Sequence, residues 1–264
     1  MDLIIGVAKN LTLQQLTPWM NSVNQSGYTG DRVLIVVGDN NIEYPQWQVI
    51  TVADTHELIH EQRFRHILHY LQDKQYRYVI STDTRDVVFQ RNPVEFLLLH
   101  NTYSYIASSE SIALLHEQWN TQNMLNNFGE YFYNEIKHLD ILNVGVLAGE
   151  YTAIKDMMKM LFLQLQRART TKNFDLAVID QTAYNILMRT YPYTQHTLEQ
   201  RLDDAWACNL HITHHSNQWA NYIKGTKPTV KNGYIVNKYN QPYYIVHQYD
   251  RDAQLLNIVL EKYK

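Results

Sequence analysis

Within residues 1–100, short apolar runs alternate with longer segments in which apolar and polar positions repeat at helical spacing. The apolar runs are typical of buried strands and lie at 3–8, 32–37, 47–52 and 76–81. The amphipathic segments predict helices at 13–23 and 56–71. Strands that alternate with helices form a mostly parallel sheet with helices on both faces, so we expect an α/β fold.

After residue 93 the pattern is less regular, although strands and helices are still predicted. The predicted strands are 103–107, 141–147 and 205–212. The predicted helices are 94–100, 151–167, 177–190 and 253–263. Segments 234–237 and 243–247 flank a turn and are typical of a hairpin, whereas 108–138 has no clear period. Because no repeat, low-complexity stretch or linker interrupts the chain, we expect one domain over 1–264.

The composition narrows the class of protein. The 264 residues are 45% hydrophobic and 19% charged, an ordinary balance for a globular chain that is long enough to bury a core. A net charge of −3, without a block of one sign, disfavours a nucleic-acid partner. Cys208 is the only cysteine, which excludes an internal disulfide and a cysteine-based metal site. No apolar run approaches the roughly 18–20 residues that span a bilayer, so we predict a cytoplasmic protein without a transmembrane segment.

The strongest chemical pattern is the run YVISTDTRDVVFQRNP at 78–93, in which a buried strand leads directly into Asp83 and Asp86. Ligands of open α/β sheets lie at the carboxyl ends of the strands. Carboxylates at that edge can hold a Mg²⁺ or Mn²⁺ ion, which in turn grips a diphosphate. The alternative is that both aspartates cap a turn and pair with Arg85 or Arg91.

This run resembles the Asp-x-Asp metal motif of GT-A glycosyltransferases, in which a strand ends in the two acids and an apolar pair follows. The sequence departs from the plain motif, because Thr84 stands two residues before Asp86 and the other acid is Asp83. The variant with Arg85 between the acids resembles a subgroup of these enzymes, and it places Asp83, Thr84 and Arg85 at the donor. It leaves open whether Asp83 binds the metal directly, binds it through water, or contacts the donor ribose or sugar.

Three later segments match the same family in order and rough spacing. Asn143 and Gly145 resemble its Asn-x-Gly strand, which lines the donor-sugar pocket, and a glycine there lets substrate approach the backbone. Asp180 and Gln181 resemble its Asp-Gln pair, which faces the donor sugar and the acceptor. His247 resembles the late histidine that supplies the third protein ligand of the metal. Taken singly, these residues also fit a tight strand crossing, a solvated helix face and a structural histidine.

Four more residues are expected to contact the nucleotide-sugar donor because of where they lie along the chain. Ala8, Lys9 and Asn10 follow the first predicted strand, where such folds usually hold the base and the ribose. Arg63 lies on the helix before the metal-motif strand and could reach the nucleotide. Because Arg63 and Arg65 differ in direction by about 200° on a helix, we expect at most one of them in the site.

Two carboxylates are candidates for the catalytic group beside the anomeric carbon. Asp180 is the first, because it is distinct from the metal ligands, and Glu110, just past a predicted strand end, is the alternative. If the reaction inverts, one carboxylate takes the acceptor proton. If it retains, a front-face attack or a covalent intermediate is needed.

The resemblance implies a GT-A, Rossmann-like fold with a mixed, mostly parallel sheet, a nucleotide-binding half at 1–100 and an acceptor- and sugar-binding half at 101–264. It implies Mn²⁺ or Mg²⁺ as cofactor and a nucleotide-sugar donor, with UDP favoured and GDP open. The acceptor would be a glycan, a lipid-linked glycan or a protein. A lipid-linked acceptor would place the protein at the periphery of a membrane.

Two other classes of protein stay open. Residues 211–215, HITHH, could form the zinc or transition-metal site of a hydrolase, although they lack the Glu of a His-Glu-x-x-His helix. The second is a non-catalytic sugar- or nucleotide-binding module with a GT-A fold. A dinucleotide oxidoreductase is disfavoured, because no Gly-x-Gly-x-x-Gly follows the first predicted strand.

Overall fold

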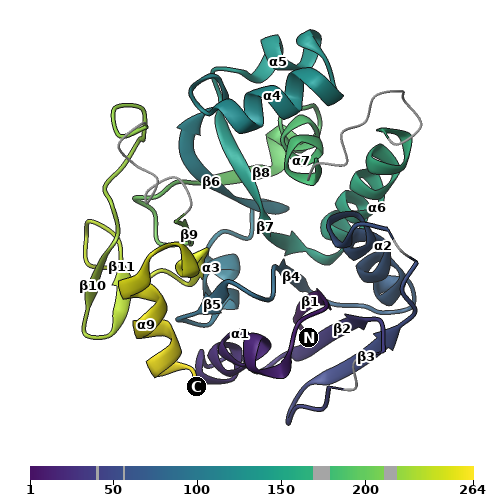
Figure 1. Ribbon diagram of the computed structural model, residues 1–264. Helices are drawn as coiled ribbons and strands as arrows, with labels where there is room; N and C mark the ends of the chain where they lie inside the picture. Colours follow the sequence, from purple (N-terminus) through teal and green to yellow (C-terminus); the bar gives the residue numbers. More distant parts are fainter. Residues whose placement is uncertain (40–41, 56, 169–178, 211–218) are drawn as a thin grey trace.

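The computed structural model describes residues 1–39, 42–55, 57–168, 179–210 and 219–264, and a seven-stranded sheet forms its centre (Figure 1). The strands are β1 Leu3–Lys9, β2 Asp31–Val37, β3 Gln48–Val52, β4 Tyr78–Thr82, β6 Tyr105–Ala113, β7 Asp140–Glu150 and β8 Thr197–Gln200. Their order is β3-β2-β1-β4-β7-β6-β8. Strands β3, β2, β1 and β4 are parallel, whereas β7 is antiparallel to both β4 and β6. The predicted α/β class with a mixed sheet is confirmed.

Helices cover both faces of the sheet (Figure 1). The α-helices of the described residues are α1 Leu13–Gln25, α2 Ile59–Leu71, α3 Pro93–Leu99, α4 Gln118–Asn127, α5 Glu130–Ile136, α6 Tyr151–Ala168, α7 Asp180–Met188 and α9 Ala253–Lys262. In β1, Ile4 belongs to the same core cluster as Trp19 of α1, whereas Leu3 and Ile5 belong to the cluster of Phe64 in α2. Successive strand residues point to opposite faces, so a continuous apolar run suits a sheet that is covered on both. None of the described helices has the length and apolar character needed to cross a membrane.

Two small sheets complete the fold and carry the C-terminal part of the chain to the site. Their strands are β5 Val87–Phe89, β9 Ala207–Asn209, β10 Thr229–Lys231, β11 Tyr234–Val236 and β12 Ile245–His247. Strand β12 is antiparallel to β5 and parallel to β9. This register sets His247 opposite Val87 on one side and Asn209 on the other. His247 therefore lies beside the residue that follows Asp86.

Helix α1 is fixed to the carboxyl end of β4. A capping box begins the helix, in which Gln15 N donates to Thr12 Oγ1 at 3.3 Å and Thr12 N donates to Gln15 Oε1 at 2.8 Å. The buried Trp19 donates from Nε1 to Thr82 Oγ1 at 2.9 Å. Because buried polar groups need partners, this bond stabilises the position of the last residue of β4, immediately before Asp83.

Strand β6 is longer and less regular than the sequence predicted. The prediction ended at residue 107, but β6 continues to Ala113 and is buried throughout. Its register against β7 shifts between Ala107 and Ser108 and again after Ser109. Ser111 has a φ of 57°, in the left-handed region, which interrupts the regular ladder. Glu110 lies in this irregular part of the strand.

Two other expectations differ from the structure. Segments 234–237 and 243–247 do not form the predicted hairpin, because β11 pairs with β10 while β12 pairs with β5 and β9. The two segments contact each other next to the turn, where Val236 forms an antiparallel bridge with Pro242 and Tyr243 N donates to Ile235 O at 3.2 Å. The segment 108–138 contains the end of β6 and helices α4 and α5. Helix α4 buries polar residues on its inner face, which hides the hydrophobic period.

Candidate metal centre and cavity

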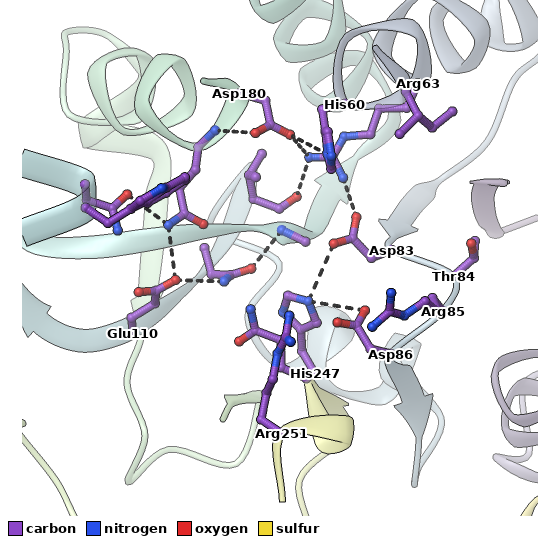
Figure 2. A pocket seen from close by; sticks show the side chains of 18 of the residues that line it. His60, Arg63, Asp83, Thr84, Arg85, Asp86, Glu110, Asp180, His247 and Arg251 are labelled. Atoms are coloured by element: carbon purple, nitrogen blue, oxygen red, sulfur yellow. Dashed lines mark hydrogen bonds and ion pairs between the residues drawn. The ribbon is translucent and has the colours of Figure 1, made fainter. Parts of the chain in front are cut away.

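A cavity of about 910 Å³ opens at the carboxyl end of β4, between α2, α4 and α7 (Figure 2). The predicted site residues that line it are Lys9, Arg63, Asp83, Thr84, Arg85, Asp86, Glu110, Asn143, Gly145, Asp180, Gln181 and His247. Ala8 and Asn10 are not part of its lining. Ala8 is buried in the core that packs against α1, and Asn10 is exposed just after β1.

Three side chains from distant parts of the sequence converge in this cavity (Figure 2). Donor atoms of Asp83, Asp86 and His247 all lie within 4.8 Å of one another. His247 Nε2 is 3.5 Å from Asp83 Oδ2 and 3.7 Å from Asp86 Oδ1. Neighbouring ligands of an octahedral cation lie about 3 Å apart when each bond is about 2.1 Å. Small side-chain movements would reach that geometry, so the group could hold a metal ion.

The imidazole of His247 is held in a defined orientation. Asn209 Nδ2 donates to Ser109 O at 3.3 Å, which leaves Asn209 Oδ1 as the acceptor for His247 Nδ1–H at 3.0 Å. The free Nε2 then faces the two aspartates. A partner on the second nitrogen is the usual way in which proteins fix a metal-binding histidine. The sequence predicted a strand around Asn209 but gave this residue no role in the site.

Gly145 has no side chain, and this leaves space for the Asp83 and His247 side chains. Together with Asp86 they form the candidate metal-binding group, called the metal group below. A Cβ atom at this position would lie 2.3 Å from His247 Cε1 and 2.9 Å from Asp83 Oδ2. The backbone of Gly145 also accepts a hydrogen bond from Asp83 N at 2.9 Å. Any larger residue would displace the His247 ring, because the ring is buried and cannot move away freely. In this structure the glycine contacts the candidate metal ligands directly.

Arg63 joins the metal group to α7. Its guanidinium donates to Asp83 Oδ1 and, at 2.6 Å, to Asp180 Oδ2. Arg65, two residues on, instead lies 3.3 Å from Glu57 Oε2 and is absent from the cavity lining. Arg63 lines the cavity and Arg65 does not, which agrees with the expectation that at most one of them would enter the site. Its observed partners are carboxylates of the protein, and its predicted contact with the nucleotide stays a prediction.

Burial and the neighbouring charges shift the pKa values of Asp83, Asp86 and His247. Burial alone would raise the pKa of Asp83, but Arg63 and His247 outweigh burial and hold this pKa well below its usual range. Burial raises the pKa of Asp86 despite the opposing charge of His247. Burial alone would lower the pKa of His247, but Asp86 and Asp83 outweigh it and raise this pKa. The group therefore attracts positive charge, and a bound metal ion would replace the proton on His247.

The two candidate catalytic carboxylates have different surroundings. Asp180 is buried at the start of α7, where its Oδ1 accepts from Gln181 N at 2.8 Å and its Oδ2 accepts from Arg63. Glu110 Oε1 accepts from Asn143 Nδ2 at 2.9 Å and from Gln181 Nε2 at 3.2 Å. Its other oxygen, Oε2, is buried and has no hydrogen-bond partner among the described residues.

Three residues that the sequence placed at the nucleotide-sugar donor contact other residues of the protein. Lys9 Nζ lies 2.8 Å from Asp54 Oδ1, and Arg85 pairs with Asp250 at 2.7 Å. Thr84 is buried, and its methyl group fills the space beside Gly6, where a Cβ would lie only 2.3 Å from it. Thr84 therefore has a packing role even though it borders the cavity.

Several lining residues had no role in the sequence interpretation. They are His60, Glu117, Gln118, Trp119, Asn120, Gln122, Trp219 and Arg251. Most come from α4 or from the residue that caps it, in the segment where no period was visible. The histidine tract at 211–215 lies outside the described residues, so the structure says nothing about a metal site there.

Comparisons with known proteins find no family model that matches this chain and no curated protein that matches it. The fold and the site define its class. It is an α/β protein with a mixed seven-stranded sheet, and its Asp83, Asp86 and His247 side chains form a group that could hold a metal ion.

Proposed function

We propose that this protein is a divalent-cation-dependent glycosyltransferase, which moves a sugar from a nucleotide-sugar, with UDP as the first nucleotide to test, to an acceptor hydroxyl group. The observation that carries the proposal is the convergence of Asp83, Asp86 and His247 at one end of a large cavity. Two carboxylates and an imidazole form a donor set for a divalent cation, and the carboxylate oxygens are ligands that suit Mn²⁺ or Mg²⁺. The space left by Gly145 fits this use, because it lets the histidine and one aspartate face the same point.

The position and size of the cavity support a nucleotide-sugar as the ligand. The cavity lies at the carboxyl end of β4, next to the point where the parallel part of the sheet meets antiparallel β7, and ligands of open α/β sheets bind at such edges. Its volume of about 910 Å³ is near the upper end of the usual range for ligand pockets, about 300–1,000 Å³. Basic side chains suited to phosphate line it beside the metal group, among them Arg251.

A divalent cation bound to the group would supply the positive charge that neutralises a diphosphate leaving group. The protein's own residues prepare the site for that charge. Asn209 orients His247, and Arg63 holds the carboxylate of Asp83. The carboxylates that line the cavity favour the positive charge that develops on a sugar ring as its anomeric bond breaks.

A screen of nucleotide-sugars tests this function. UDP- and GDP-sugars are incubated with the protein and with Mn²⁺, Mg²⁺ or EDTA, and the release of UDP or GDP is measured. We expect release from at least one donor with metal and none with EDTA. Asp86→Ala should abolish release, whereas Asp73→Ala, at an exposed aspartate after α2, should leave it unchanged. Release that persists in EDTA, or in Asp86→Ala, would contradict the proposal.

A further inference from the structure

The cavity continues past the metal group toward α4, and its chemistry changes along the way. Beyond Asn143 and Gln181, the wall consists of Glu110 together with residues of α4 and its cap. Glu110 is 5% exposed, and of its two oxygens only Oε1 is hydrogen-bonded. Oε2 has no partner among the described residues. A buried oxygen without a partner costs free energy, so a ligand hydroxyl that donates to it would restore the missing bond.

Two amides from different elements hold Glu110 in place. Asn143 belongs to β7 and Gln181 to α7, and both donate to the same oxygen, Oε1 (Figure 2). Asn120 Oδ1 in turn accepts from Gln181 Nε2 at 3.1 Å. The carboxyl group therefore has little freedom to rotate. A base that is fixed before substrate arrives loses no rotational entropy in the reaction.

Asp180, the first candidate from the sequence, lacks an available oxygen. Its Oδ2 accepts from Arg63 at 2.6 Å and lies 3.8 Å from His60 Nδ1, while its Oδ1 accepts from the backbone of Gln181. The structure therefore favours Glu110 over Asp180 as the group that accepts a proton.

The wall from α4 has side chains that suit a sugar ring. Trp119 lines the cavity and yet is 46% exposed. The exposed amides of Gln118 and Gln122 border the same space. Aromatic faces pack against the C–H groups of a pyranose, and amides both donate to and accept from hydroxyl groups. The combination of an open indole with neighbouring amides favours a saccharide over an apolar acceptor.

We propose that the α4 side of the cavity is the acceptor subsite, that its ligand is a saccharide whose ring packs on Trp119, and that Glu110 is the catalytic residue that takes the proton from the reacting hydroxyl group. This inference rests on the proposed function. The hydroxyl oxygen forms a bond to the anomeric carbon of the donor sugar, and the bond from that carbon to the diphosphate oxygen breaks. The electron pair of the broken bond leaves with the nucleoside diphosphate, and the proton of the hydroxyl moves to Glu110 Oε2.

The protonation of Glu110 agrees with this role. Burial raises the pKa of Glu110 to about 7, with Glu117 raising it further while Asn143, Gln181 and His247 oppose the shift. These groups face the carboxyl from the cap of α4, from β7, from α7 and from β12. A general base is most effective when its pKa is near the working pH.

The test compares Glu110→Gln, Glu110→Asp, Asp180→Asn, Trp119→Ala and Trp119→Phe with the wild type. With Mn²⁺ and the donor from the screen, UDP release is measured in water and with p-nitrophenyl glycosides of glucose, galactose, mannose and N-acetylglucosamine. Binding of UDP with Mn²⁺ is measured by calorimetry. Glutamine preserves the shape of residue 110 and an acceptor for both amides, so this variant should fold normally.

We expect at least one glycoside to accelerate UDP release by the wild type. Glu110→Gln should lower kcat by about 10²–10⁴-fold and leave UDP affinity within twofold. Glu110→Asp, which keeps a carboxylate, should recover part of this loss. Trp119→Ala should raise the KM of the glycoside at least tenfold, whereas Trp119→Phe, which keeps an aromatic face, should recover most of this loss.

Several results would overturn the inference, and they differ from a failure of the proposed function. Glu110→Gln with a kcat within threefold of wild type would remove the residue from catalysis, and an equal loss of UDP binding would make its role structural. Poor turnover in Asp180→Asn, with normal UDP affinity and active Glu110→Gln, would assign the base to Asp180. Metal-dependent release that no glycoside accelerates would exclude the saccharide subsite but keep the transferase. No release from any donor would refute both.

Discussion

Two acidic sites on neighbouring strands of the same sheet show how differently this fold treats carboxylates. Asp140, at the start of β7, has a side chain that is 1% exposed and lies within ion-pair distance of both Lys224 and Arg201. Two cations of the protein therefore lie against this carboxylate, although Arg201 also lies 3.7 Å from Glu199 Oε1. Asp83, just after β4, has one arginine partner, Arg63, which it shares with Asp180.

The two sites differ in how much negative charge lacks a cationic partner in the protein. Around Asp83 the described residues place two further carboxylates, Asp86 and Asp180, against one arginine and two histidines, His60 and His247, and the group faces a cavity. Asp140 has two cationic partners and does not line this cavity. An uncompensated group of carboxylates is costly in a folded protein unless a cation binds there. The comparison teaches that the first site suits a ligand and the second holds the fold together.

The largest expected effect is on turnover. Asp86→Ala removes one of the proposed metal ligands, and losing several kcal/mol of electrostatic stabilisation corresponds to at least about 10²–10³-fold in rate. Asp140→Ala should retain the wild-type rate per folded molecule, because its charge is not used in the cavity. The measurement is UDP release at saturating donor and Mn²⁺, normalised to folded protein by circular dichroism. Equal losses in the two variants would erase the distinction between the sites.

The next effect is on metal affinity. Gly145→Ala should weaken Mn²⁺ binding by about 10–100-fold, as is typical when a residue supporting a metal ligand is changed. The physical reason is the 2.3 Å approach of the new Cβ to His247 Cε1, which forces the ring out of place. Calorimetric titration of Mn²⁺ measures it, with Asn209→Ala as a second way to release the same ring. Wild-type affinity in both variants would show that His247 is not a ligand.

A smaller effect concerns the stability of the fold. Asp140→Asn should lower the free energy of unfolding by about 1–3 kcal/mol, because it removes the buried partner of Lys224 and Arg201. Both cations are about half exposed and can turn to water, which limits the loss. Urea unfolding measures the change, and Asp73→Asn, at the surface, should stay within about 0.5 kcal/mol of wild type. An Asp140→Asn variant as stable as the wild type would mean that the ion pairs of Asp140 with Lys224 and Arg201 do not stabilise the fold.

The smallest expected effect is an increase in the free energy of unfolding, whereas the preceding one is a decrease. In EDTA, Asp86→Asn should raise the free energy of unfolding by about 0.5–1 kcal/mol, because it relieves the repulsion between Asp86 and Asp83. Burial raises the pKa of Asp86, which means that the ionised form destabilises the fold at neutral pH. Urea unfolding in EDTA at pH 7 and pH 5 checks this. The gain should shrink at the lower pH, and a loss of stability at pH 7 would contradict it.

The sequence predicted local features of this molecule well. The apolar runs of β1, β2 and β4 are visible because each strand is buried on both faces. The position of Asp83 and Asp86 at a strand end follows from the same run. The helical spacing around Arg63 also showed that Arg63 and Arg65 point apart, as they do.

Features that depend on distant pairing were harder to predict. His247 meets Asp86 only because β12 pairs with β5, and the sequence instead suggested a hairpin for that segment. The role of Asn209 depends on the register between β9 and β12. Helix α4 was missed because two of its three buried residues, Asn120 and Asn123, are polar, which leaves Met124 as the only apolar residue on its buried face.

The central claim is that Asp83, Asp86 and His247 bind one divalent cation. The most direct measurement is the electron paramagnetic resonance signal of free Mn²⁺, followed as wild-type protein and Asp86→Ala are added in turn. We predict that the wild type removes one equivalent of the free-ion signal and binds more tightly when UDP is present, whereas Asp86→Ala leaves the signal unchanged. Equal uptake of Mn²⁺ by the two proteins, or no uptake by the wild type with UDP present, would contradict the claim.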